Sequence, residues 1–303
     1  MSTPDLTPDL LTAITPAERR PPQWLLTIKE AWRMGRTKAG VAIFLFVVAL
    51  AVLGPLVAPH SPTSFVARPF AGPSAKAWLG TDYIGHDVLS RVLWGGRTVI
   101  GLALAATVIG LLLGVGLGMI SGYARRWLDE TVMRILDIIL AFPSIVLALL
   151  FVSIVGPKLW LIVLIVGISH APRIARVTRA ATVEFAQRDF IKAAEALGVA
   201  RRKILSFEIL PNITSPLLVE FGLRLTYSIG IIAGMSFLGF GLQPPAADWG
   251  LMINENRIGV TVQPWPVAVP VILIAILTIG TNLIADGMGR ALIGIERDTG
   301  GGK

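Results

Sequence analysis

Residues 99–123 decide the fold. They read VIGLALAATVIGLLLGVGLGMISGY and hold no charged side chain. An apolar run of this length can cross the hydrocarbon core of a bilayer as a single helix. Four of its glycines, Gly110, Gly114, Gly118 and Gly122, recur at intervals of four residues and therefore share one helix face. Glycine lets two backbones approach closely, so we expect another helix against this face. Packing within the chain is the default, and contact with a second subunit is the alternative.

Comparable apolar runs recur along the chain. Hydrophobic residues make up 54% of the 303 residues and charged residues only 15%, whereas ordinary soluble domains carry about 25% charged residues. Runs of this length need a bilayer to cover them. We therefore predict an all-α integral membrane protein with about six transmembrane helices. The expected spans are roughly 39–57, 99–123, 132–155, 159–172, 213–240 and 267–285.

Prolines and flanking segments modify these spans. Pro143 follows Phe142 inside the third span and should kink it, because proline removes a backbone donor. The fourth span is short and can continue beyond Pro172 into water. Ahead of the first span, the apolar residues from Gln23 to Arg36 fall near helical spacing among basic residues, which indicates a helix lying on the membrane surface. The residues before that helix are predicted to be unstructured.

The distribution of basic residues sets the orientation. Cationic loops resist translocation, and with the N-terminus inside, the cytoplasmic segments hold roughly three times as many basic residues as the outer ones. Both termini are therefore predicted in the cytoplasm, with Trp160, Trp249 and Trp265 at the outer interface. The predicted divisions are a cytoplasmic tail with the interfacial helix (1–38), the first transmembrane helix (39–58), an extracytoplasmic loop (59–97), a transmembrane core (98–292) containing a cytoplasmic loop (180–211), and a cytoplasmic tail (293–303).

The chain carries few groups suited to catalysis or metal binding. It has no cysteine, which excludes disulfides, thiolate metal sites and a cysteine nucleophile. Its histidines, His60, His86 and His170, are far apart, and no phosphate-binding loop of the form GxxxxGK(S/T) occurs. The cytoplasmic loops account for the net charge of +8, which therefore does not point to nucleic acid. We predict that the chain is not an enzyme and holds no cofactor or metal.

Charged residues inside the predicted spans are the candidates for a translocation path. Glu220 and Arg224 lie four residues apart in the fifth span, so they share a helix face and can pair. Charge at membrane depth is costly, which makes such residues functional candidates. An internal ion pair without a ligand is the alternative. Asp137 and Asp286 lie toward helix ends, where helix packing or hydration is the expected role.

The most informative segment runs from Arg188 to Pro211. Its first part, RDFIKAAEALG (188–198), is an alanine-rich helix pattern with Asp189 as the expected N-cap and Gly198 as the expected stop. Small alanine side chains let such a helix enter a partner's cleft. The alternative is that the segment is a solvated connector, and the periodicity of its sequence, taken alone, favours this alternative.

This segment resembles the cytoplasmic EAA loop of permeases in binding-protein-dependent ABC importers, in which E-A-A, a glycine and Leu-Pro stand at fixed spacing. Ala193, Ala194, Gly198, Leu210 and Pro211 match that pattern, whereas Lys192 replaces the first glutamate and Glu195 does not restore the register. The resemblance implies that a short cytoplasmic helix couples this chain to an ATPase. The implied coupling residues are Phe190, Ile191, Lys192, Ala193, Ala194, Glu195, Leu197 and Gly198.

Further motifs narrow the resemblance. The stretches 79–91, 140–144 and 236–250 look like those of dipeptide, oligopeptide and nickel permeases, with His86 where arginine is expected. The resemblance implies a type I ABC importer-like fold with a long outer loop between the first two transmembrane helices. It also implies a heterodimer with a second permease subunit, two ATPase subunits that bind ATP and Mg, and an extracytoplasmic substrate-binding protein. The candidates for docking that protein are Asp82, Tyr83, Asp87 and Arg91.

The expected function is the import of short peptides, dipeptides first, across the cytoplasmic (inner) membrane. Within the family, oligopeptides, nickel chelates and haem are alternative cargoes. Outside it, the alternatives are an ion-coupled secondary transporter that works through Glu220, Arg224 and Asp137, and a membrane scaffold or receptor. Ion-coupled carriers usually contain inverted repeats and broken helices, and neither is clear in this sequence. For the outer loop around 82–91, structural packing is the alternative to docking.

Overall fold

The computed structural model describes residues 23–124 and 126–300, and its regular elements are helices. The tail predicted before Gln23 lies outside the described residues. Within the described part, extended backbone pairs only in isolated bridges, Phe65 with His86 and Thr81 with Asp87. The helices are α1 (Gln23–Arg33), α2 (Gly35–Val57), α3 (Val88–Tyr123), α4 (Arg126–Leu140), α5 (Ser144–Val155), α6 (Leu159–Ala186), α7 (Asp189–Ala196), α8 (Arg201–Lys203), the π-helix η2 (Ile204–Ile209), α9 (Leu210–Asn212), α10 (Thr214–Phe237), α11 (Trp249–Asn256), the 3-10 helix η3 (Arg257–Gly259) and α12 (Trp265–Gly300).

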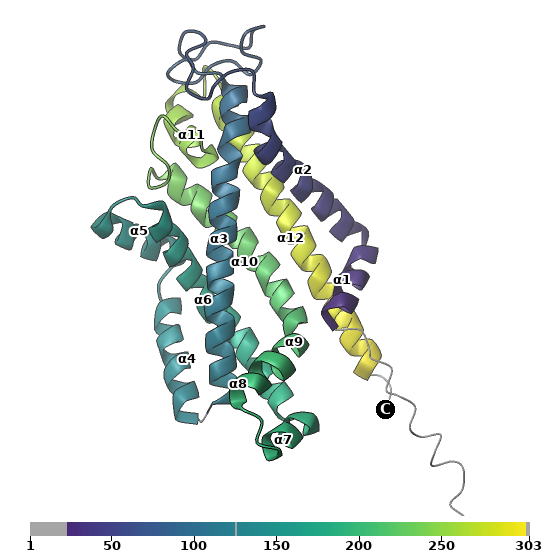
Figure 1. Cartoon of the computed structure of the whole chain (residues 1–303). Helices are drawn as coiled ribbons and strands as arrows, with labels where there is room; N and C mark the ends of the chain where they lie inside the picture. The colour runs from purple at the N-terminus through teal and green to yellow at the C-terminus, as the bar shows by residue number, and fades with distance from the viewer. Residues whose placement is uncertain (1–22, 125, 301–303) are drawn as a thin grey trace, which may run out of the picture.

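Five described helices, α2, α3, α6, α10 and α12, are long and apolar enough to span a membrane. The pair α4 and α5 makes a sixth span if the bent pair is counted as one. Figure 1 shows α3, α6, α10, α12 and α2 running beside one another as the body of the molecule. The prediction of an all-α membrane protein with about six spans is confirmed.

The third predicted span is broken rather than gently kinked. α4 ends at Leu140, α5 begins at Ser144, and the two helices differ in direction by 81°. Pro143 has no N–H to continue the hydrogen-bond ladder, and the residue before a proline is pushed out of the helical region. The predicted position of the kink is therefore right, but the bend is too large for one continuous helix.

Several helices run past the predicted limits of their spans. α3 begins at Val88, so residues 88–97 of the predicted outer loop are helical. Asp87 caps this start, because its carboxylate accepts hydrogen bonds from the backbone N–H of Ser90 at 2.9 Å and from the Ser90 hydroxyl at 2.6 Å. α12 continues to Gly300. α6 continues through Pro172 to Ala186, as the short fourth span allowed.

The glycine face of α3 packs against α6 of the same chain. A Cβ atom built on Gly110, Gly114, Gly118 or Gly122 would lie between 2.6 and 2.9 Å from a backbone carbonyl oxygen of α6. Real Cβ atoms do not approach that closely, so the glycines are what allows the two helices to touch along their backbones. The predicted close approach is confirmed, and the default interpretation, packing within the chain, accounts for all four glycines.

Ion pairs connect neighbouring helices at their polar ends. The Arg36 guanidinium of α2 lies 2.5 Å from the Asp286 carboxylate of α12, and that of Arg176 in α6 lies 2.5 Å from the Asp137 carboxylate of α4. These side chains are about half exposed, so each pair adds little to stability. Asp137 and Asp286 therefore link neighbouring helices, which agrees with the expected role in helix packing or hydration.

α1 is an amphipathic helix set against the bundle. Thr27 is buried, and its hydroxyl donates a hydrogen bond to Ser215 of α10 at 3.1 Å. Leu25, Ile28 and Trp32 are exposed on its other side. An exposed apolar stripe of this kind fits the predicted surface helix, which ends at Arg33 rather than at Arg36.

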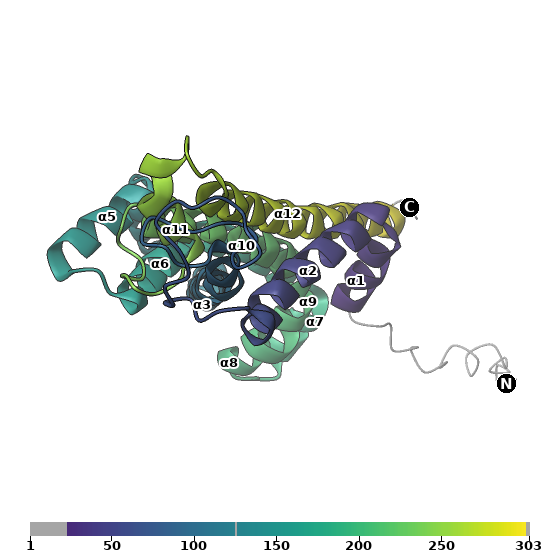
Figure 2. The same ribbon diagram turned by 90° about the horizontal axis from the view of Figure 1, so that it is seen from above.

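The molecule has two dissimilar ends. Residues 58–87, which we call the cap, form an irregular layer at one end beside α11, and α7, α8 and α9 lie at the other end (Figure 1). In the view from above, α1 and α5 lie at opposite flanks of the bundle (Figure 2). The candidate sites occupy the α7 end, the interior of the bundle and the cap.

Candidate functional site

α7 turns most of its surface away from the bundle. Ile191 is its one buried side chain and packs with Ile204 and Ile209 of the π-helix. Phe190 is 46% exposed, and Leu197, directly after the helix, is 83% exposed. A short helix with one apolar anchor and a free apolar face is suited to contact with another protein.

The start of α7 differs from the prediction. Arg188, with extended backbone, is the N-cap residue, and Asp189 stands in the first turn, so the prediction of an Asp189 N-cap is wrong. In the first turn a carboxylate still interacts favourably with the helix dipole. Asp189 also lies 3.6 Å from the ammonium group of Lys192, the residue that replaces the expected glutamate.

The end of α7 is the predicted glycine stop. Gly198 has a φ of +75°, a conformation that glycine adopts without strain. The N–H of Gly198 donates to the carbonyl of Glu195 at 2.9 Å, and the N–H of Val199 donates to that of Ala194 at 3.0 Å. This pair of hydrogen bonds closes the helix end and fixes the direction in which the chain leaves it.

Two links connect α7 to the membrane-spanning helices. The hydroxyl of Tyr123, the last residue of α3, donates a hydrogen bond to the carboxylate of Glu195. The π-helix Ile204–Ile209 places Ile204 and Ile209 against Ile191, with Ile213 and Leu217 completing the buried cluster at the start of α10. A displacement of α7 would therefore act on α3 and α10 together.

Glu220 and Arg224 form an ion pair inside the bundle. Arg224 Nε lies 3.1 Å from Glu220 Oε2, and the two side chains are 9% and 13% exposed, Arg224 being the more buried. The Arg224 guanidinium also lies 5.2 Å from the ring centre of Tyr227. The predicted pairing is confirmed; a role in translocation stays a prediction.

Three buried polar side chains meet at the centre of the bundle, and sequence reasoning missed them. His170 Nε2 of α6 lies 3.0 Å from the hydroxyl of Ser228 in α10, which is 2.9 Å from the hydroxyl of Thr107 in α3. Each comes from a different span, so no spacing in the sequence connects them. They join the three central helices by hydrogen bonds where lipid and water are excluded.

The cap is held by a buried network around Asp82. One carboxylate oxygen of Asp82 accepts hydrogen bonds from the backbone N–H groups of Ile84, Gly85 and His86 at 2.8 to 2.9 Å. The other carboxylate oxygen pairs with the guanidinium of Arg91, which is 1% exposed. A fully buried carboxylate is tolerable only when it is satisfied in this way.

Arg91 extends the network to α11. Its Nη2 lies 3.0 Å from the Glu255 carboxylate, and the Tyr83 hydroxyl donates to the same carboxylate at 3.0 Å. Burial raises the pKa of Glu255 above its ordinary value, more strongly than the nearby Arg91 lowers it. Burial also raises the pKa of Tyr83 to about 12, assisted by Glu255. These contacts fix the cap to α11.

α11 is in turn fixed to α3. Trp249 is fully buried, and its indole N–H donates to the carbonyl of Val92 at 2.8 Å, so the prediction that it lies at the outer interface is wrong. Gly96 makes room for the indole ring. Asp248 caps α11 by accepting from the Leu251 N–H at 3.1 Å, and burial raises the pKa of its carboxyl group. Trp160 and Trp265 are exposed, and their position at the outer interface stays a prediction.

The four candidates for docking a binding protein therefore differ in solvent exposure. Asp82, Asp87 and Arg91 are at most 1% exposed, and their side chains point into the cap. They can shape a docking surface but do not themselves form its outer face, which agrees with the packing alternative for this loop. Tyr83 is only partly buried. The large exposed apolar groups of the cap are Phe65 and Trp78.

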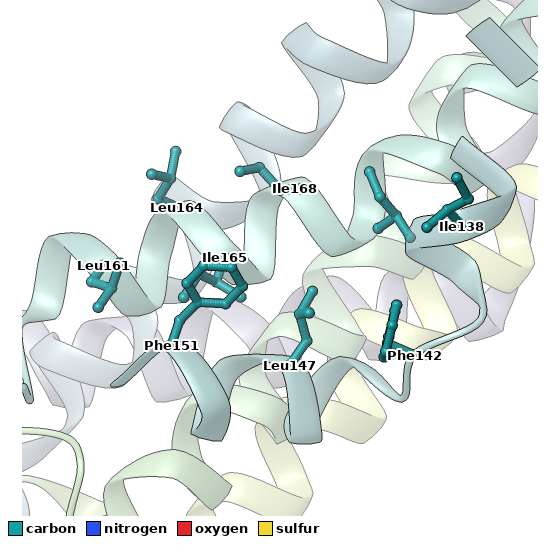
Figure 3. A pocket seen from close by; sticks show the side chains of 9 residues that line it. Ile138, Phe142, Leu147, Phe151, Leu161, Leu164, Ile165 and Ile168 are labelled. Atoms are coloured by element: carbon teal, nitrogen blue, oxygen red, sulfur yellow. The ribbon is translucent and has the colours of Figure 1, made fainter. Parts of the chain in front are cut away.

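An apolar pocket of about 290 Å³ lies where α4, α5 and α6 meet. Figure 3 shows Leu147 and Phe151 of α5 pointing toward the α6 side of the pocket, with Phe142 on the side of Ile138. Its lining contains no polar side chain, so it offers nothing to the charged ends of a peptide. Among the side chains that the structure describes, those of residues 23–124 and 126–294, no group of three or more His, Cys, Asp or Glu could hold a metal ion.

Comparisons with known proteins agree on one family. Residues 114–293 match the family model described as the binding-protein-dependent transport system inner membrane component. The dipeptide transport system permease protein DppC of Alkalihalophilus pseudofirmus is 33% identical over 285 residues, which cover 94% of this chain and 91% of the relative. The glutathione transport system permease protein GsiD of Pectobacterium atrosepticum is 35% identical over 270 residues, covering 87% and 90%.

A further relative and a solved structure agree with these matches. The di/tripeptide transport system permease protein DppC of Pseudomonas aeruginosa is 34% identical, covering 88% of this chain and 91% of the relative. A chain from inward-facing conformations of the MetNI methionine ABC transporter matches with a TM-score of 0.51 and 21% identity. That match covers 65% of this chain and 96% of the solved one, and it supports the fold.

Proposed function

Because the chain belongs to the family of binding-protein-dependent transport system inner membrane components, we propose that it imports short peptides, dipeptides first, under the control of separate ATPases. The protein is a multi-pass membrane protein and a permease subunit of a type I ABC importer. This membership supports an ATP-driven importer over the ion-coupled carrier and the scaffold.

The observation that carries the proposed coupling is the construction of α7. Ile191 is the one buried side chain of the helix, and Phe190, Ala193 and, directly after the helix, Leu197 are exposed. In our proposal this exposed face seats in a cleft of an ATPase subunit. ATP and Mg bind in that partner, and the chain itself supplies no catalytic group.

The link from α7 to the spans is the proposed lever. Closure of the ATPases moves α7, and the hydrogen bond from Tyr123 to Glu195 carries the motion to α3 while the cluster around Ile204 carries it to α10. The spans then change between two packings that open to opposite sides of the membrane. Glu220 and Arg224 lie on α10 and are our candidates for the path that opens.

The proposed assembly has a second permease subunit as a heterodimeric partner, two ATPase subunits and an extracytoplasmic substrate-binding protein. We place the α7 end in the cytoplasm with both termini, and the cap outside, where the binding protein docks. The basis for this orientation is the excess of Lys and Arg in the segments at the α7 end.

The proposed cargo follows the names of the relatives. Those named above are described as dipeptide, di/tripeptide and glutathione permeases, and all three descriptions name short peptides. Oligopeptides, nickel chelates and haem remain alternatives that no observation on this chain favours.

The test is uptake by the assembly purified with its native partners and reconstituted into vesicles. Dialanine should accumulate only when ATP is present on the ATPase side, and a proton gradient without ATP should give none. The variant Ala193→Trp adds bulk on the exposed face of α7 and should keep ATP hydrolysis while uptake stops. Wild-type uptake by Ala193→Trp would remove α7 from the coupling, and gradient-driven uptake without ATP would remove the proposed function.

A further inference from the structure

A second hollow, of about 390 Å³, opens at the cap end of the bundle. We call it the rim pocket. It lies between the cap, the first turns of α3 and the loop that precedes α11, and its lining includes Trp94, Arg97, Thr98, Gln243, Ala246 and Ala247. Its volume falls within the range of about 300–1,000 Å³ that is usual for small-molecule sites. Unlike the pocket between α4 and α6, it contains a charged group.

That charged group is Arg97, whose guanidinium lies over an aromatic ring. Its guanidinium carbon lies 4.5 Å from the centre of the Trp94 ring, one helical turn earlier. Stacking on the ring orients the guanidinium and leaves its N–H groups available. Among the residues that the structure describes, no carboxylate oxygen lies within the 4.0 Å of Arg97 that defines an ion pair. Arg91, six residues earlier, is by contrast neutralised by Asp82 and Glu255.

The wall opposite Arg97 is fixed in place. The Gln243 side-chain N–H groups donate to the carbonyls of Gly239 at 2.9 Å and Gly241 at 3.2 Å, which fixes this side chain on its own loop. The carbonyl of Ala246 accepts from Arg91 at 3.2 Å, so the loop is tied to the buried network of the cap. The cation thus borders a hollow whose loop wall is held by hydrogen bonds.

We propose that the rim pocket binds a carboxylate group, with Arg97 as the residue that pairs with it. A planar guanidinium matches the two oxygens of a carboxylate in a bidentate pair. Two sources share this chemistry, the C-terminus of a short peptide and an acidic side chain of a partner protein seated on the cap. The peptide source rests on the proposed function, whereas the carboxylate site itself does not.

The absence of cysteine from the chain makes a local probe possible. Thr98→Cys places one thiol in the lining, and its reaction rate with uncharged N-ethylmaleimide is measured on the full chain in lipid nanodiscs. Dialanine should slow the reaction, and dialanine amide, which lacks the carboxylate, should not. Arg97→Gln should weaken the protection by dialanine roughly ten- to hundredfold, the loss expected for a charge-assisted hydrogen-bond pair.

Two further variants guard this experiment. Ala247→Cys, also in the lining, repeats the measurement if the thiol at position 98 disturbs the helix. Lys76→Gln removes an exposed cation of the cap outside the pocket and should leave the protection unchanged. Equal protection by dialanine and its amide, or protection that survives Arg97→Gln, would overturn the proposal.

The second arm uses the assembly purified with its native partners and without added peptide. One outcome is that the thiol introduced by Thr98→Cys reacts more slowly in the assembly than in the isolated chain, and that this protection disappears with Arg97→Gln. If dialanine also gives no protection on the isolated chain, the carboxylate belongs to a partner protein. Absence of Arg97-dependent protection in both arms overturns the site. An assembly that shows this protection but imports no dialanine keeps the site and rejects the proposed cargo.

Discussion

Single residues decide how closely the spans of this protein can pack, and Gly118 shows it most sharply. A Cβ there would lie 2.6 Å from the Ala175 carbonyl oxygen and 2.6 Å from Thr178 Cβ, whereas a Cβ on Gly116 meets nothing within 4 Å. Gly118→Ala should therefore destabilise the protein by about 1–3 kcal/mol, the usual cost of overpacking. Thermal unfolding in detergent measures the change.

Gly116→Ala is the matched control for that substitution. It makes the same chemical change two residues away on the same helix, where the new methyl group has open space. Because alanine favours helix over glycine, Gly116→Ala should be neutral or slightly stabilising. Equal melting temperatures for the two variants would show that the α3–α6 contact does not depend on the glycine face.

Glu255 gives the cap a dependence on pH. Its pKa in the folded protein is raised by burial above the ordinary value of 4.5, so the folded state holds the proton more tightly than the unfolded chain. The free energy of unfolding should then fall as the pH rises from about 4.5 through the raised value. Glu255→Gln cannot ionise and should lack this slope.

The measurement is the melting temperature of the wild type minus that of Glu255→Gln, followed from pH 4.5 to 7. This difference should decrease with rising pH. Glu208→Gln, which changes an exposed glutamate, should give no such trend. A difference that increases with pH would mean that attraction to Arg91 outweighs the burial of Glu255.

At the scale of the element, different side chains of α7 serve the stability of the protein and the proposed contact with the ATPase. Ile191 is fully buried, while Phe190 beside it is 46% exposed. Ile191→Ala should lower stability by about 2–5 kcal/mol, as for other buried large-to-small changes. Phe190→Ser should leave the melting temperature nearly unchanged and weaken copurification of the ATPase subunits. The opposite pattern would place the wrong face of α7 against the partner.

The elements also show what the sequence could predict. The existence of the spans, the glycine face of α3 and the end of α7 at Gly198 depend on the periodicity or backbone preference of one segment, and these agree with the structure, although several span limits do not. Asp189 failed as an N-cap because Arg188 adopts the extended backbone that the cap position requires. For the third span the position of the bend was predicted correctly but its size was not, because the sequence locates a proline break at Pro143 and does not give the 81° angle that packing imposes.

The contacts inside the bundle could not be predicted from the sequence, because each of them joins residues from several helices. The hydrogen bonds from His170 to Ser228 and from Ser228 to Thr107 join three spans, and each residue alone looks like an ordinary small or polar member of its helix. Trp249 was placed at a membrane interface by its residue type, yet it fills the space beside Gly96. Contacts of this kind depend on the packing of whole helices, which no local pattern encodes.

The whole molecule makes a prediction about orientation, because its two ends differ in charge. Arg201, Arg202 and Lys203 follow α7, and cationic segments resist translocation, so the α7 end should face the cytoplasm and the cap the outside. Trp78 in the cap is 69% exposed and Leu197 is 83% exposed, so a cysteine at either position is accessible without disturbing the core. In intact cells stripped of any outer barrier, a membrane-impermeant thiol reagent should label Trp78→Cys at once. Leu197→Cys should react only after the membrane is opened and any bound ATPase is removed by denaturant. Labelling of Leu197→Cys in intact cells would show that the α7 end faces outward, and ATP would then have to act from the outer side.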